Sequence, residues 1–267
     1  MAVSGARAST VVWQDGVGNW YGDANWVVDG ALNQTVPDQT TNDDEIIIAG
    51  GTVTYNPGGD FGLNWGATTV AVDSGASLVQ TTTHWWRFNG NGSFSVNGGT
   101  VTTHATNVQF GESGTDTASF FISGGEFIHT GTGQLKVRGG NNFEVAGGLV
   151  SSRFYSIGDY GLTSIDLSDG IVRLLDGSIN YNGIYGGPID FTDGSTGTFN
   201  VGNISVPDAI SAYLNTGKVR ANGVTDSSLF NVVEDGSGGV NITLVPEPST
   251  SILSLLFLGF ALRRRRQ

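Results

Sequence analysis

Short runs of alternating apolar and polar residues recur along the middle of the chain, and each run leads into a glycine-rich corner. Residues 70–79, 93–101 and 119–127 are examples. Alternation with a period of two predicts β-strands with one buried face, and the glycines permit a sharp turn at positive φ. The corner glycines, at positions 51, 75, 99, 125, 148 and 170, are separated by 24, 24, 26, 23 and 22 residues.

Near-constant spacing of one corner motif indicates a solenoid in which each unit is one coil. A single unit cannot bury its own apolar face, so the units must stack and share a continuous core. The sequence therefore predicts an all-β fold, a right-handed parallel β-helix of about six coils over residues 46–204. A β-sandwich also has short strands and Gly-rich turns, but it is not expected to repeat one corner motif at this spacing.

The segment after the repeat, residues 205–245, is predicted to cap the last coil. It begins with a short helix that has Pro207 in its first turn, Asp208 at its positive end and Gly217 as its stop. Strands expected around 218–224, 229–233 and 240–244 complete the cap. Such a segment is needed because an uncapped coil exposes both its core and a strand edge.

The segment before the repeat, residues 9–45, is rich in tryptophan. It contains Trp13, the pairs Asn19-Trp20 and Asn25-Trp26, Pro37 and Asp43. This order resembles the opening segment of exported bacterial β-helix proteins with autotransporter-type repeats, which implies an N-terminal cap. In physical terms, the indole rings are large enough to plug the open end of a coil.

After Leu244 the chain changes to three short segments in a fixed order. Pro246, Glu247 and Pro248 form an extended, protease-accessible stretch, because prolines forbid a helix there. A helix over the apolar run 249–262 is about 21 Å long, shorter than a hydrocarbon core of about 30 Å. The terminal Arg263, Arg264, Arg265 and Arg266 are expected to snorkel to the cytoplasmic side. The residues expected to span the membrane are Ile252, Leu253, Leu255, Leu256, Phe257, Leu258, Phe260 and Leu262.

This three-part order over residues 246–267 resembles the PEP-CTERM sorting signal of Gram-negative and related bacteria. The resemblance implies recognition by an exosortase-type membrane protease, cleavage near Pro-Glu-Pro, and passage from an inner-membrane intermediate to the cell surface or extracellular matrix. A plain tail anchor is the alternative. At the other end, Ala6-Arg7-Ala8 suits a signal-peptidase site, so residues 1–8 are expected to be the remnant of a signal peptide, with a chance match as the alternative.

Composition and charge narrow the classes of function. Without the four arginines and the one Glu after position 245, the body keeps 8 basic and 23 acidic residues, a net charge of −15. Such a surface repels phosphate backbones, so we expect no nucleic-acid partner. The absence of Cys excludes disulfides, thiol catalysis and Cys-ligated zinc.

Titratable residues offer weak candidates for chemistry. His104 and His129 follow corner glycines at similar distances and would be neighbours on adjacent coils, but a solvated or stacked polar position is commoner than a metal pair. The acids at 38, 43, 44 and 45 lack the ligand order of known calcium loops. Asp166, Asp169, Asp176, Asp190 and Asp193 invite comparison with β-helix polysaccharide hydrolases and lyases, yet they form no adjacent pair in the sequence and Asp-Gly turns explain two of them. We expect no catalytic residue, no metal and no cofactor.

Trp85 and Trp86 are the candidate glycan contacts. Adjacent residues of a strand point to opposite faces, so both indoles cannot lie inside and at least one is expected at the surface. Flat aromatic rings stack well on pyranose sugars. The alternative is a single exposed aromatic at the edge of a coil.

These observations predict an exported, exosortase-sorted surface or matrix protein with a structural or adhesive role, with exopolysaccharide as a partner. The alternative is a polysaccharide-binding or polysaccharide-degrading β-helix protein. A groove with converging carboxylates and an Arg or Lys would favour the enzyme, whereas ladders of Thr, Ser and Asn would favour the structural role.

Overall fold

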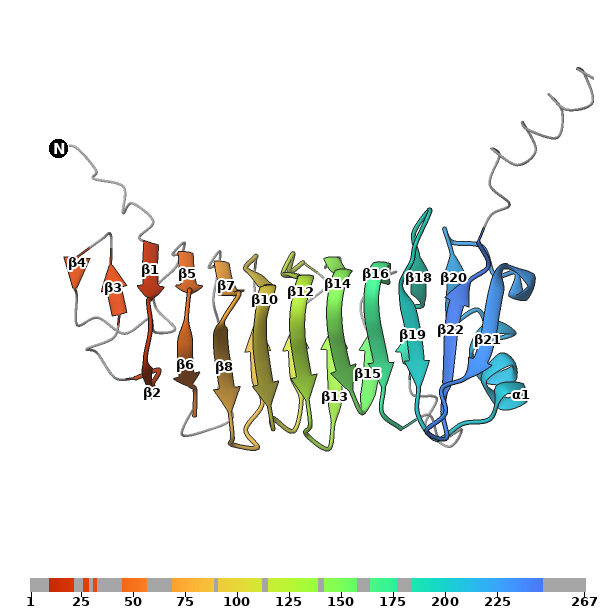
Figure 1. Cartoon of the computed structure of the whole chain (residues 1–267), viewed down its shortest axis with the longest axis horizontal. Helices are drawn as coiled ribbons and strands as arrows, with labels where there is room; N and C mark the ends of the chain where they lie inside the picture. The colour runs from red at the N-terminus through yellow and green to blue at the C-terminus, as the bar shows by residue number, and fades with distance from the viewer. Residues whose placement is uncertain are drawn as a thin grey trace, which may run out of the picture.

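The strands of this protein stand side by side in one long row (Figure 1). The computed structural model describes residues 10–21, 26–28, 31–32, 45–56, 69–88, 91–111, 115–138, 142–157, 164–176 and 184–246. These residues form two sheets, one of 17 strands and one of five, which we call the wide sheet and the narrow sheet. The predicted all-β fold is confirmed.

The wide sheet contains β1 (Thr10–Trp13), β2 (Val17–Asn19), β3 (Trp26–Val28), β4 (Ala31–Leu32), β5 (Glu45–Ile48), β6 (Gly51–Thr54), β7 (Thr69–Asp73), β8 (Ala76–Gln80), β10 (Ser93–Thr103), β12 (Ser119–His129), β14 (Asn142–Ser152), β16 (Ile165–Leu174), β18 (Ile189–Phe191), β19 (Thr198–Val201), β20 (Val219–Ala221), β21 (Phe230–Glu234) and β22 (Val240–Leu244). The narrow sheet contains β9 (Trp86–Phe88), β11 (Val108–Phe110), β13 (Gln134–Val137), β15 (Phe154–Ile157) and β17 (Ile184–Gly186). From β7 to β17, each coil passes through the wide sheet and then through one strand of the narrow sheet.

Parallel pairing between successive coils makes this architecture a β-solenoid of about five turns. All four neighbouring pairs within the narrow sheet are parallel as well. The parallel solenoid is therefore confirmed, with one full turn fewer than the six corner glycines indicated. The wide sheet also begins earlier than residue 46, because β1 already pairs with β5 in parallel register.

Buried side chains repeat at the same position of each coil and form columns along the axis. One column runs through nine strands in register, and its members are Val11, Ile46, Val70, Phe94, Phe120, Phe143, Ile165, Ile189 and Val219. The rings of Phe94 and Phe120 are stacked with centroids 5.7 Å apart, and those of Phe120 and Phe143 are 4.6 Å apart. Burying one such side chain stabilises the fold by about 1.5–3 kcal/mol, which explains why the alternation is so regular.

The glycine corners lie in the middle of the wide sheet. Gly51, Gly75, Gly125, Gly148 and Gly170 have φ between 67° and 85°, as the sequence predicts. At the third corner the positive φ falls on Gly98 (105°) and not on Gly99, where Asn97 and Gly98 both lie opposite Asp73 of β7 and form a bulge. The prediction for Gly99 was one residue out.

The N-terminal end of the core is closed by three indole rings. Trp13, Trp20 and Trp26 are all at most 1% exposed. The Trp26 ring makes edge contacts with the other two, at centroid distances of 5.2 Å and 5.0 Å, and its Nε1–H donates to the Trp20 carbonyl. These rings cover the end of the apolar core, which a further coil would otherwise have to cover.

The C-terminal end is capped by a short helix and a hairpin. Helix α1 (Val206–Ala209) starts at Ser205, whose hydroxyl accepts from Asp208 N, and continues as a π-helical turn over Ile210–Leu214. Strands β20, β21 and β22 fall where the sequence predicts them, and β22 pairs antiparallel with β19 and β21. The predicted capping helix is confirmed, whereas the predicted tail helix lies outside the described residues.

Candidate functional site

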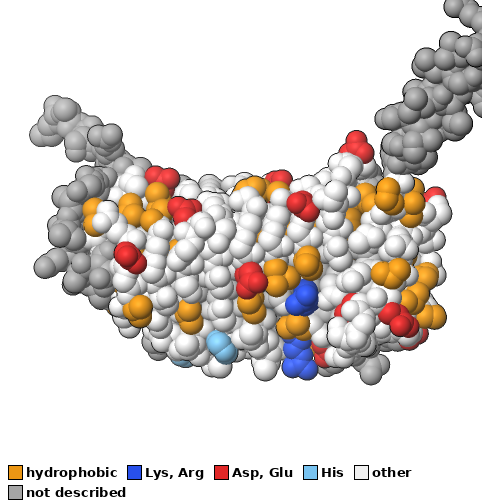
Figure 2. Space-filling view, in the orientation of Figure 1, with side chains coloured by type: hydrophobic (Ala, Val, Ile, Leu, Met, Phe, Trp, Pro, Cys, Tyr) orange, Lys and Arg blue, Asp and Glu red, His pale blue; other side chains and the backbone are white. Residues whose placement is uncertain are grey.

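The outer face of the wide sheet carries ladders of small polar side chains. Thr69, Ser93, Ser119 and Asn142 are opposite one another on successive strands, and the Ser93 hydroxyl donates to the Thr69 hydroxyl at 3.1 Å. At the corner, Asn97 Nδ2 donates to Asp73 Oδ1 at 3.1 Å. Figure 2 shows this side mostly uncharged, with scattered acidic and apolar side chains and a few Lys or Arg side chains. Polar side chains of this face thus form hydrogen bonds with those of the neighbouring coil.

Three carboxylates form a second ladder that the sequence analysis missed. Glu144, Asp166 and Asp190 are in register on β14, β16 and β18. The Asp166 carboxylate accepts from the Ser164 hydroxyl at 2.6 Å, and the Asp190 carboxylate accepts from Gly223 N at 3.0 Å. They lie on an open strand face, whereas a glycosidase holds two carboxyl groups about a sugar within a cleft.

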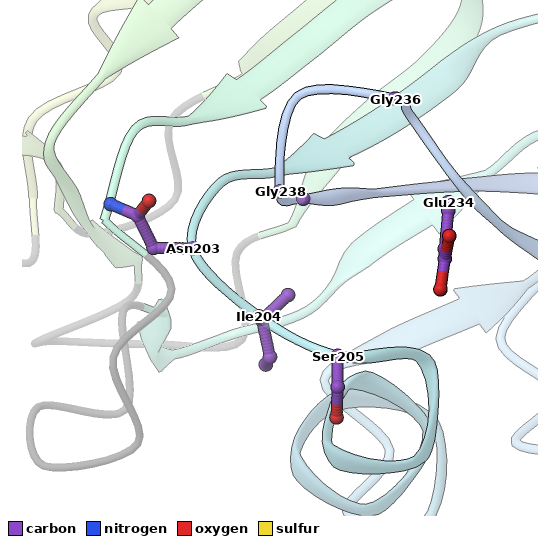
Figure 3. A pocket seen from close by; sticks show the side chains of 7 residues that line it. Asn203, Ile204, Ser205, Glu234, Gly236 and Gly238 are labelled. Carbon is purple, nitrogen blue, oxygen red and sulfur yellow. The ribbon is translucent and has the colours of Figure 1, made fainter.

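Two hollows lie at the C-terminal cap. The first, of about 520 Å³, is lined by Asn203, Ile204, Ser205, Glu234 and a glycine turn. Figure 3 shows that the polar side chains of Asn203, Ser205 and Glu234 stand apart and do not converge on one point. The second, of about 640 Å³, runs between the 193–197 segment and residues 243–246. Among the described lining residues of both hollows there is no His, Lys or Arg, and each hollow contains one carboxylate, Glu234 in the first and Asp193 in the second.

The two histidines considered as a metal pair have separate surroundings. His129 is fully buried, with Nε2–H donating to the Ala105 carbonyl at 2.8 Å and Nδ1 lying 2.9 Å from the Ser152 hydroxyl. Burial lowers the pKa of His129. His104 lies at the coil surface, where its Nδ1 donates to the Gln80 carbonyl at 3.1 Å. In register, the partner of His129 is Thr103 and not His104. Within the described residues no group of three potential metal ligands occurs.

The adjacent residues Trp85 and Trp86 differ in burial. Trp86 is 1% exposed and packs among Tyr55, Phe88 and Phe94, so the prediction of a glycan contact is wrong for this residue. Trp85 is only partly buried. Two cations lie over its ring, the Arg87 guanidinium at 4.6 Å and the Lys136 ammonium at 5.1 Å from the centroid. Trp85 is therefore part of a cation–π cluster and not a bare stacking surface.

The residues around Trp85 belong to the outer face of the narrow sheet. Arg87, Gln109 and Lys136 lie in register on β9, β11 and β13, while Trp86, Val108 and Leu135 point into the core. Since both flanking cations reach the same indole, the Trp85 ring lies over the middle strand. This explains why Gln109, although on the outer face, is only 1% exposed. We call Trp85, Arg87, Gln109 and Lys136 the Trp85 cluster.

Of the predicted sorting motif, only Pro246 is described, and it is exposed where the chain leaves β22. Glu247, Pro248, the expected membrane residues 252–262 and the arginines 263–266 lie outside the described residues, as do Asp38, Asp43 and Asp44. Among the helices of the described part, none is long and apolar enough to cross a membrane.

The fold and these faces place the chain in one structural class, the parallel β-solenoids with capped ends. No family model, curated protein or solved structure matches the sequence.

Proposed function

We propose that this protein is an exported bacterial surface or matrix protein with a structural or adhesive role. The destination is inferred from the tail, in which Pro246, Glu247 and Pro248 precede an apolar run and a terminal arginine cluster. An exosortase-type protease would cleave near that motif and release the solenoid from its inner-membrane intermediate. The tail would form a short membrane helix before cleavage.

The observation that carries the structural role is the polar ladder on the wide sheet. Its Thr, Ser and Asn side chains bond to the next coil, as the Thr69–Ser93 and Asp73–Asn97 pairs do. Such ladders support rigidity and presentation, whereas catalysis requires groups that converge on a substrate. We also propose a right-handed coil, because crossovers between parallel strands of one sheet have that hand in nearly all proteins.

Sorting is tested by producing the full chain in a bacterium that contains an exosortase-type protease and in the same strain lacking it. We expect a shorter chain at the surface or in the medium only when the protease is present, with the new C-terminus near Pro246 by mass spectrometry. Replacing Pro246, Glu247 and Pro248 by Ala should keep the chain full-length and in the membrane fraction. Identical mass and location in both strains would refute the proposal.

The non-catalytic role has its own assay. The purified protein is incubated with neutral and acidic polysaccharides, and new reducing ends and unsaturated products are measured. We expect none above a heat-denatured control. Reproducible turnover that is lost on changing Asp166 to Asn would instead establish the polysaccharide-degrading alternative.

A further inference from the structure

Charge is divided unequally between the two sheets. The five strands of the narrow sheet contain Arg87 and Lys136 and no Asp or Glu. The wide-sheet strands carry several acids, among them Glu126, Glu144 and Asp166. The wide-sheet strands also carry two cations, Arg173 and Arg220. What distinguishes the narrow-sheet strands, in a body with a net charge of −15, is that their two cations have no Asp or Glu beside them on those strands.

The Trp85 cluster gives that face a defined arrangement. Arg87 and Lys136 are two strands apart, which is about 10 Å for strands spaced at about 4.8 Å. The Trp85 ring lies between them, within 5.1 Å of both charged groups. Beneath it, Gln109 Nε2 donates to the Gly111 carbonyl at 3.0 Å, while its Oε1 is buried and accepts no hydrogen bond. The cluster therefore presents two cations and a ring, with the Gln109 amide buried beneath them.

A second aromatic residue extends this face along the coils. Phe154 on β15 is opposite Gln134 on β13 and stands two residues before Ser156, as Trp85 stands two residues before Arg87. Phe154 also has a cation over its ring, the Arg153 guanidinium at 5.3 Å, and Arg153 forms an ion pair with Asp176 at 3.5 Å. A ring with a cation over it thus occurs at Trp85, beside β9, and again at Phe154 on β15, three strands along the narrow sheet.

We propose that the outer face of the narrow sheet binds an acidic polysaccharide whose sugars carry carboxylates. Arg and Lys pair with carboxylates, while aromatic rings suit sugar rings. A row of strands suits a polymer, because the cations of β9 and β13 and the rings of Trp85 and Phe154 are spread along one sheet. Nucleic acid fits less well, since its dense phosphate charge is repelled by the acidic remainder of the body. This inference deepens the proposed function and rests on it for the extracellular setting.

The test measures binding of the purified full-length protein to polygalacturonate by isothermal titration calorimetry. Lys136→Gln and Arg87→Gln should each weaken binding by about two- to fivefold, as removal of one exposed charge pair does. Lys136→Arg keeps the charge and should bind like the parent protein. Lys218→Gln removes the same charge at the C-terminal cap and serves as the matched control. Melting curves of all four variants check that the fold is retained.

Comparison polymers separate the competing explanations. Fully methyl-esterified polygalacturonate keeps the sugar backbone but has no free carboxylate, so it should bind much more weakly, and added salt should weaken binding of the acidic form. Equal binding of both forms, equal loss in Lys218→Gln and Lys136→Gln, or tighter binding of single-stranded DNA would overturn the inference. Because this assay uses purified protein, its failure is distinguishable from failure of sorting in the cell.

Discussion

Replacing Gly125 by Ala is predicted to disrupt the solenoid far more than the same change at Gly75. Both glycines occupy corners with positive φ, 73° and 85°, so each alanine faces the same backbone strain. The difference lies in space. A Cβ on Gly75 would meet nothing within 4 Å, whereas a Cβ on Gly125 would lie 2.0 Å from the Gly99 carbonyl oxygen of the neighbouring coil.

The magnitudes follow from these distances. At Gly75 the left-handed conformation costs about 1–2 kcal/mol, partly offset by about 0.4–1 kcal/mol because alanine lowers the entropy of the unfolded chain. At Gly125 the overlap with a backbone atom also forces two coils apart, so a loss above about 4 kcal/mol is expected. Gly98→Ala should fall between them, since its Cβ would contact the Ser74 Cβ at 3.3 Å.

Thermal and urea unfolding, followed by far-ultraviolet circular dichroism and tryptophan fluorescence, measure the three variants. For a chain of this size a loss of 1 kcal/mol lowers Tm by about 2–4 °C. Gly75→Ala should thus lower Tm by a few degrees and Gly125→Ala by about 10 °C or more. If Gly125→Ala were no less stable than Gly75→Ala, close coil-to-coil approach would not be what selects glycine at this corner.

Two further predictions concern the core. Burial lowers the pKa of His129 below its usual 6.5, so the unfolded chain binds more protons and stability should fall as pH drops below about 6.5. His129→Gln should flatten the pH dependence of the urea midpoint between about pH 6.5 and 5, and an unchanged slope would contradict the assignment. Trp26→Ala should cost about 3–5 kcal/mol, because it removes the ring between Trp13 and Trp20. Tyr21→Ala, at a side chain that is 51% exposed, is its control in the same unfolding assay. An equal loss of stability in both variants would refute the role of the indole rings in closing the N-terminal end of the core.

The wide sheet was largely predictable because short-range rules repeat in it. Alternation identified the buried column through Phe94, Phe120 and Phe143, and the glycines identified the corners. The shift from Gly99 to Gly98 escaped prediction, since either residue of a Gly-Gly pair can adopt positive φ and the bulge beside Asn97 decides between them. The sequence of a turn limits the conformations it can adopt, and the register of the neighbouring strands selects one of them.

Which of Trp85 and Trp86 is buried could not be predicted from these two residues alone. Adjacent strand residues face opposite sides, so Trp85-Trp86 alone does not indicate which ring is inside. Phe88 supplies the missing information, because it shares a face with Trp86 and both are buried. If Phe88, two positions after Trp86, is taken into account, the sequence alone predicts that Trp86 is inside and Trp85 is outside.

Neighbours in a solenoid lie one coil apart in sequence, and this determines which side-chain columns a sequence reveals. Glu144, Asp166 and Asp190 are 22 and 24 residues apart, the same period as the glycine corners, so their ladder was present in the spacing. Arg87, Gln109 and Lys136 are 22 and 27 residues apart, because connections of different length lead to the short narrow-sheet strands. Their register becomes visible only in three dimensions. Arg87 and Lys136 therefore come together only through folding. A loss of binding that depends on these two charges would thus test the folded face itself.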